Sequence, residues 1–263
     1  MSRRPVLIVV ILLAVAACCG IYFAVEWAAA DAEVREYDQI QSSYSEVVYD
    51  ESAGESDAPV SETDGLPYTL VDFDSLLEQN PDTVGWITIP DTLINYPVVQ
   101  TTNNSRYLNT SFSGTRSGAG AVFADAKNNM RELNQNTVLY GHNMGSGRTD
   151  MFGTLLYYND AEHYDRHRYI QFDTIYEQHG WWKIFAVINH DVRSQDFDYL
   201  RLDFESTNEF MEWVATAQAL SLYEADVEIQ EDDWILTLST CDRQFYGRSG
   251  RQLILAVKMN GGE

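Results

Sequence analysis

Cysteine is scarce in this chain: of 263 residues three are cysteine, and only Cys241 lies outside the first 30 positions. Two common motifs are also missing. No glycine-rich stretch ends in the GK[ST] of a phosphate-binding loop, and no HExxH pair offers the ligands of a zinc protease. What remains is one isolated thiol, which is either a small buried hydrophobe, as free cysteines often are, or a nucleophile.

Basic residues are few as well. The sequence has 17 Lys and Arg against 40 Asp and Glu, a formal charge of -23 at pH 7. Such a surface repels phosphate groups and other polyanions. The charge therefore argues against nucleic acid and other anionic polymers as partners.

Cys241 ends an apolar run at 234–241, which is typical of a buried strand. Arg251 follows ten positions later, where the next strand would bring a cation back beside the thiol. His142 follows a β-branched and aromatic run that breaks at Gly141. The sequence therefore places this histidine at the rim of a sheet, where it either reaches a substrate or is a loop histidine without a role.

Taken together, these segments resemble the sortase family, and class B sortases in particular. The resemblance rests on the order of seven segments and on the spacing between Cys241 and Arg251. The segments are 84–90, 94–100, 107–109, 120–125, 140–144, 238–241 and Arg251. It implies a mainly β fold: a closed barrel of about eight strands with N-terminal helices and an inserted helix near 206–223. The first four segments are read as successive strands of this barrel.

The resemblance also implies a reaction. Cys241 would attack a carbonyl, Arg251 would stabilise the oxyanion, and His142 would move protons. A sortase of this class cleaves a C-terminal sorting signal, commonly of the Asn-Pro-x-Thr type, after threonine. It then transfers the acyl group to an amine of peptidoglycan or of a pilin, and it needs no cofactor.

Three further residues match positions of the family's substrate groove: Tyr140, Ser239 and Asp242. For Asp242 a turn-forming role at the end of the strand is an equal alternative. His163 and His167, four positions apart, could share a metal ion on a helix, but no third ligand is evident, so we expect no metal site.

Two other functions remain open. The first is a non-catalytic extracellular binding or adhesion domain on the same barrel, because fold does not imply function. The second is a wall-crosslinking L,D-type transpeptidase, whose cysteine usually follows a Ser-x-Gly turn. Leu238-Ser239-Thr240-Cys241 does not fit that turn.

The N-terminus predicts a membrane anchor. Arg3 and Arg4 precede an uncharged stretch at 5–25, about the 20 residues that a membrane helix requires, so the amino end should be cytoplasmic and the rest extracellular. Residues 15–18 also resemble a lipobox with Cys18 as the lipid anchor. The apolar stretch continues past Cys19, which favours the intact helix.

We therefore expect a cytoplasmic stub and anchor at 1–30, an acidic disordered linker at 31–66 and a catalytic domain at 67–263. Residues 31–44 could instead extend the membrane helix. Within the domain, 73–79 predicts a short helix before Pro81. Residues 206–223 predict a longer helix with a capping box at Ser206 and Glu209. Its apolar face should pack on the core and consists of Phe210, Trp213, Val214, Ala217 and Leu220.

Overall fold

The computed structural model describes residues 4–49, 63, 65–145 and 147–259, and the chain divides into two compact units, Met1–Gln39 and Ile40–Glu263. The first unit consists of most of helix α1, which spans Arg4–Tyr44. Within the described residues, Ile11–Tyr44 is the one helix long and apolar enough to cross a membrane. Ile21 and Phe23 are exposed on it, as residues facing lipid would be.

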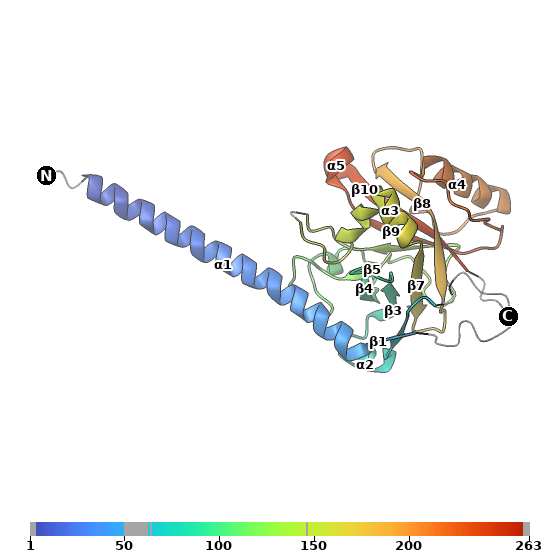
Figure 1. Ribbon diagram of the computed structural model, residues 1–263, viewed down its shortest axis with the longest axis horizontal. Helices are drawn as coiled ribbons and strands as arrows, with labels where there is room; N and C mark the ends of the chain where they lie inside the picture. Colours follow the sequence, from blue (N-terminus) through green and yellow to red (C-terminus); the bar gives the residue numbers. More distant parts are fainter. Residues whose placement is uncertain (1–3, 50–62, 64, 146, 260–263) are drawn as a thin grey trace. The chain divides into compact units, whose positions relative to one another are not determined.

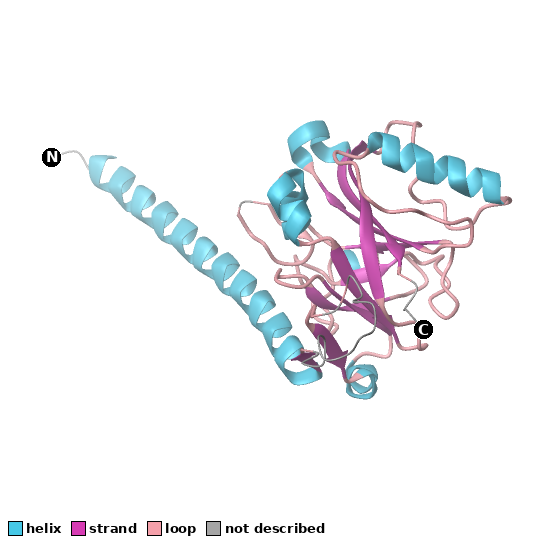
Figure 2. Ribbon diagram, turned by 45° about the vertical axis from the view of Figure 1, so that its right-hand side comes forward, coloured by secondary structure: helices cyan, strands magenta, loops and turns pink. Residues whose placement is uncertain are grey.

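The second unit is built on a closed barrel, in the order β10-β8-β7-β3-β4-β5-β6-β9 (Figures 1 and 2). The strands are β3 (Thr83–Thr88), β4 (Asn95–Val99), β5 (Val122–Ala124), β6 (Asn136–Tyr140), β7 (Tyr169–Thr174), β8 (Trp181–Asp191), β9 (Ile235–Cys241) and β10 (Gly250–Lys258). The predicted mainly β barrel of about eight strands is confirmed. Closing the barrel leaves no free strand edge.

Six of the eight neighbouring strand pairs are antiparallel, while β4 with β5 and β6 with β9 are parallel. The parallel pair β6 and β9 matters most for the site. Because parallel strands run in the same direction, the residues that follow both strands emerge at the same rim of the barrel.

The inserted helix α4 (Thr207–Leu220) confirms the predicted helix near 206–223. Ser206 caps its N-terminus by accepting a hydrogen bond from the Glu209 amide at 3.3 Å. The Glu209 carboxylate bonds the Glu205 amide at 2.9 Å, so the capping box is only half formed. Phe210 and its predicted neighbours are buried in a core cluster with residues of β8 and β10, but Leu220, the last helical residue, is 36% exposed.

The smaller helices lie between the strands. They are α2 (Phe73–Gln79), as predicted, α3 (Ala161–Arg166) and α5 (Arg243–Tyr246), with 3-10 turns η1 (Arg106–Leu108), η2 (Gly153–Asn159) and η3 (Gly247–Ser249). Residues 107–109 were expected to form a strand, which is wrong. The Asn103 side chain accepts hydrogen bonds from the amides of Ser105 and Arg106, both at 3.0 Å, and this local turn begins η1 instead.

The first part of the predicted linker is structured, and the alternative given for residues 31–44, an extension of the membrane helix, is what the structure shows. Residues up to Tyr44 continue α1, and β1 (Ser45–Val48) pairs with β2 (Tyr68–Val71) in a separate antiparallel sheet. This pairing joins residues 20 to 26 positions apart, which local composition does not reveal. Residues 50–62 and 64, the centre of the predicted linker, lie outside the described residues.

Candidate active site

The parallel pairing of β6 with β9 brings the candidate histidine and cysteine together. In this register Tyr140 stands beside Ser239, so His142 and Cys241 each lie two positions further along. Three hydrogen bonds tie the two strand ends together: Gly141 N to the Ser239 carbonyl at 3.3 Å, the Thr240 hydroxyl to the Gly141 carbonyl at 2.8 Å, and Asn143 Nδ2 to the Cys241 carbonyl at 2.8 Å. The rim position predicted for His142 follows from this arrangement.

The segment after β6 folds back over an aromatic ring. The Phe152 amide donates to the His142 carbonyl at 3.0 Å, and the ring packs directly on Gly141. A Cβ at Gly141 would lie 2.5 Å from the Phe152 ring, far inside van der Waals contact. Gly141 is therefore needed to hold the backbone of His142 against the barrel.

Arg251 is the cross-strand partner of Cys241 in the antiparallel pair β9 and β10. Side chains of directly opposite residues leave the same face of a sheet, with Cβ atoms about 5 Å apart. The Arg251 Nη1 donates to the Gly250 carbonyl at 2.8 Å and to the Arg248 carbonyl at 3.3 Å. These bonds fix one side of the guanidinium, and the Arg251 side chain also hydrogen-bonds Tyr199.

A pocket of about 240 Å³ unites these side chains. Its lining includes five of the six predicted site residues, namely Cys241, His142, Arg251, Tyr140 and Ser239, together with Asn104, Leu108, Phe123, Gly141, Tyr199 and Thr240. Arg251 is the one permanently charged side chain among these lining residues. A lone cation in this pocket can stabilise an anion that forms next to it.

Asp242 is the predicted site residue that the structure does not bring to the pocket. Its side chain is 1% exposed and caps α5, where Oδ1 accepts a hydrogen bond from the Gln244 amide at 2.7 Å. The alternative interpretation, a turn-forming aspartate at the end of the strand, matches this position.

One wall of the pocket is organised by Asp125, which sequence analysis did not select as a site residue. Its Oδ2 accepts hydrogen bonds from the Tyr140 hydroxyl at 2.8 Å and from Asn104 Nδ2 at 2.7 Å. Burial, followed by the hydrogen bond to Asp125, raises the pKa of Tyr140 well above its ordinary value. Tyr140 therefore stays protonated and oriented toward the carboxylate.

Leu108 and Tyr199 also belong to the site but carry no sequence signal of their own. The Leu108 carbonyl accepts a hydrogen bond from Nε2 of His142 at 2.8 Å. Tyr199 is 6% exposed, and burial raises the pKa of its phenol while hydrogen bonding from Ser239 opposes that rise. Only long-range packing places these two residues beside Cys241.

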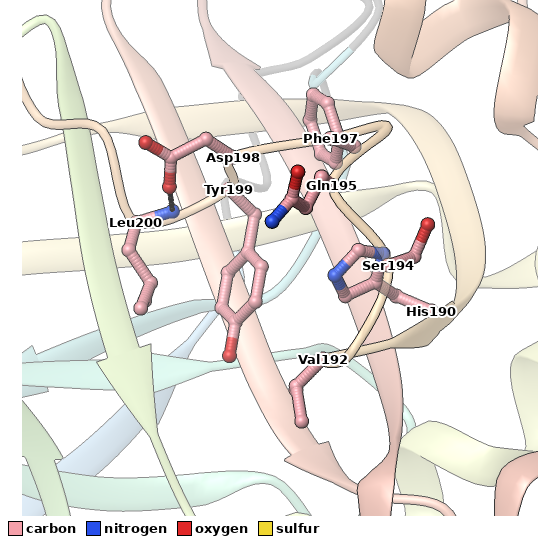
Figure 3. Close-up of a pocket in the computed structure, with 8 residues that line it drawn as sticks. All are labelled: His190, Val192, Ser194, Gln195, Phe197, Asp198, Tyr199 and Leu200. Atoms are coloured by element: carbon pink, nitrogen blue, oxygen red, sulfur yellow. Dashed lines mark hydrogen bonds between the residues drawn. The ribbon is translucent and has the colours of Figure 1, made fainter.

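A second hollow of about 320 Å³ adjoins the pocket and shares Tyr199 with it. Figure 3 shows its lining, from His190 at the end of β8 to Leu200, with the Leu200 amide donating to Asp198 Oδ1 at 3.2 Å. His190 is the partner of Arg251 on β8, and burial lowers its pKa, which favours the neutral imidazole. A row of His190, Arg251 and Cys241 therefore crosses three adjacent strands.

The pair His163 and His167 forms a compact cluster with tyrosine rings. The two imidazole centroids lie 4.2 Å apart, and Nδ1 of His167 is 2.9 Å from the His163 carbonyl oxygen, which accepts its hydrogen bond. Across the described residues, no group of three or more His, Cys, Asp or Glu side chains is arranged to hold a metal ion.

Comparison with known proteins decides the family. A model of the sortase domain matches residues 87–259, well over half of the chain. The chain belongs to the sortase family. Among curated relatives, this sortase is 33% identical over 187 residues to Sortase B of Staphylococcus aureus, an alignment that covers 71% of the chain and 74% of the relative. It is 35% identical over 182 residues to Sortase B of Listeria monocytogenes, with 68% and 70% covered.

Solved structures agree with the sequence relatives. The Staphylococcus aureus sortase B-substrate complex matches with a TM-score of 0.66 at 32% identity, covering 72% of this chain and 85% of that one. Sortase B of Bacillus anthracis in complex with AAEK1 matches with a TM-score of 0.65 at 30% identity, covering 91% and 98%. The resemblance to class B and the assignment to the cysteine transpeptidases are thereby confirmed.

Proposed function

We propose that this sortase cleaves a C-terminal sorting signal after its threonine and transfers the new acyl end to an amine of peptidoglycan or of a pilin. The observation that carries the proposal is the register of β9 and β10, which pairs Cys241 with Arg251, next to His142 in the same pocket. A binding module would have no need of these three groups in one pocket.

The residues divide the chemistry in two steps. In the first, the Cys241 sulfur bonds to the threonine carbonyl carbon, the C–N bond breaks, and His142 gives a proton to the leaving amine. Arg251 donates hydrogen bonds to the oxyanion that forms between these events. In the second step the acceptor amine bonds to the same carbon, passes a proton to His142, and releases the thiolate.

The sorting signal extends beyond the pocket. At about 240 Å³ the pocket is smaller than the roughly 300–1,000 Å³ of sites that enclose a drug-sized ligand. The second hollow, which shares Tyr199 with the pocket, offers a further surface. We therefore assign Tyr140 and Ser239 to the residues next to the cleaved bond, and the second hollow to residues further along the signal. A relative of similar structure has been solved as a sortase B-substrate complex, which supports substrate binding by this fold.

The proposed setting is the outer face of the cell membrane. Helix α1 carries exposed apolar side chains over a length that can cross a bilayer, and Arg3 and Arg4 precede its apolar stretch. This orientation keeps the amino end cytoplasmic, anchors the chain in lipid, and presents the barrel to secreted proteins that carry sorting signals.

A peptide screen tests the proposed function. The full chain in detergent is incubated with a library of sorting-signal peptides, with and without an amine acceptor, and product masses identify the cleaved bond. We expect cleavage after threonine, and a second product bearing the acceptor. Peptides that bind without any product would indicate the non-catalytic binding domain instead.

A further inference from the structure

We propose that Gly120 is a positioning residue for His142. Because Gly120 has no side chain, η1 can lie close enough for the Leu108 carbonyl to bind one nitrogen of the His142 imidazole. The other imidazole nitrogen is then the one that exchanges protons with the substrate. The inference rests on the proposed function for its catalytic consequence, but its structural part can be measured without turnover.

The hydrogen bond to Leu108 determines the tautomer of His142. Its Nε2 lies 2.8 Å from the carbonyl oxygen of Leu108. A carbonyl oxygen only accepts hydrogen bonds, so Nε2 carries the proton whenever this bond is present. In the neutral imidazole the lone pair is then on Nδ1. Nδ1 is therefore the atom that takes the proton of the incoming amine and returns one to the leaving amine.

Gly120 packs directly against the backbone of η1. Its φ is +63°, a left-handed conformation that glycine adopts without strain. A Cβ at this position would lie 2.2 Å from the Tyr107 carbonyl oxygen and 3.1 Å from that of Leu108. Both contacts are with backbone atoms, which cannot turn away as the end of a side chain can. An added methyl group would collide with the Tyr107 carbonyl and press on the neighbouring Leu108 carbonyl that holds His142, so η1 must shift.

Hydrogen bonds of Tyr107 hold η1 in place. Tyr107 is 2% exposed, and its hydroxyl accepts a hydrogen bond from Asn80 Nδ2 at 2.9 Å and donates one to Asp82 Oδ2 at 2.9 Å. Its carbonyl accepts from the Ala121 amide at 3.0 Å. Because Tyr107 is held both through its hydroxyl and through its carbonyl, η1 has little freedom to absorb a methyl group without moving Leu108.

The chain offers a matched control in Gly114. Its φ is +81°, so alanine meets comparable backbone strain there, but nothing lies within 4 Å of a built Cβ. Gly114→Ala and Gly120→Ala therefore differ chiefly in the collision with η1. An effect seen in both variants would come from the backbone conformation alone.

The test combines nuclear magnetic resonance with kinetics on the full chain in detergent. In the wild type, the 15N shifts of the His142 ring should show the Nε2-protonated tautomer, and the opposite tautomer would overturn the proposal. Gly120→Ala should lose the single tautomer and lower kcat at least tenfold, since a misplacement of about 1 Å can cost roughly a hundredfold. KM for the peptide should change less than twofold. Gly114→Ala should match the wild type in all three measurements.

If Gly120→Ala does not fold, Ser117→Ala tests the turn that carries Gly120 without adding an atom. The Ser117 hydroxyl oxygen accepts from the amides of Ala119 and Gly120, both at 3.1 Å, and so holds the turn that presents Gly120. A fall in kcat with unchanged KM supports the proposal, and an unchanged kcat overturns it. A wild type that cleaves no peptide would defeat the proposed function, whereas equal kcat in Gly120→Ala and Gly114→Ala would defeat only this inference.

Discussion

Replacing Arg251 by lysine keeps a positive charge opposite Cys241 but removes the planar guanidinium. In the structure Nη1 already bonds the carbonyls of Gly250 and Arg248, which orients the remaining donors. An ammonium is a point charge on a flexible stem and cannot hold these carbonyls and an oxyanion in the same fixed geometry. The variant therefore separates directed hydrogen bonding from charge.

The expected loss follows from one misplaced oxyanion donor. Removing such a donor costs about 3 kcal/mol, or roughly 10²- to 10³-fold in kcat. The backbone should stay in place, because β10 is hydrogen-bonded to β8 on one side and to β9 on the other. We therefore expect kcat of Arg251→Lys to fall by about two orders of magnitude, with a smaller change in KM.

The assay is steady-state peptide cleavage followed by mass, with Arg166→Lys as the control. Arg166 is exposed on α3 and pairs with Glu162 on the same helix, so its replacement should not change kcat. An Arg251→Lys enzyme whose kcat/KM equals that of the control would refute the reasoning, since charge alone would then suffice.

Further predictions concern the loop, the core and acid stability. Asn143→Ala should lower kcat roughly fivefold, because it removes one hydrogen bond of about 1 kcal/mol to the Cys241 carbonyl; kinetics check this. Phe210→Ala should lower the free energy of unfolding in urea by about 3–5 kcal/mol, whereas Leu220→Ala, half-exposed on the same helix, should cost far less. Burial, followed by charge repulsion from His167, lowers the pKa of His163 from 6.5 to about 4. Between pH 6.5 and 4, His163 of the unfolded chain binds a proton, whereas His163 of the folded chain stays neutral. The free energy of unfolding should therefore fall as the pH is lowered from 6.5 to 4. His163→Gln should flatten this part of the pH dependence measured by urea unfolding.

Much of the fold was predictable because its signals are local. Residues 73–79 end before a proline, and Ser206 precedes a run with a helical apolar period, so α2 and α4 follow from caps and spacing. The sequence also indicated that Cys241 ends a strand and that His142 follows one. Their meeting, however, depends on the parallel pairing of β6 with β9, which periodicity does not show.

One error has a local cause. Residues 107–109 were read as a strand from the family resemblance, yet the Asn103 side chain turns the chain into η1. The other differences come from contacts between distant segments. β1 exists because it pairs with β2. Asp125 joins the site only by accepting hydrogen bonds from Tyr140 and Asn104, and a single sequence does not show such a convergence.

The most direct test of the central claim is to trap the acyl-enzyme. The full chain is mixed with a cleavable sorting-signal peptide in the absence of acceptor, quenched in acid, digested and mapped by mass spectrometry. The account predicts that the peptide's N-terminal fragment, ending in threonine, is attached to Cys241 and not to Cys18 or Cys19, and that Cys241→Ala gives neither adduct nor product. Ordinary turnover by Cys241→Ala, or an adduct on another residue, would contradict it.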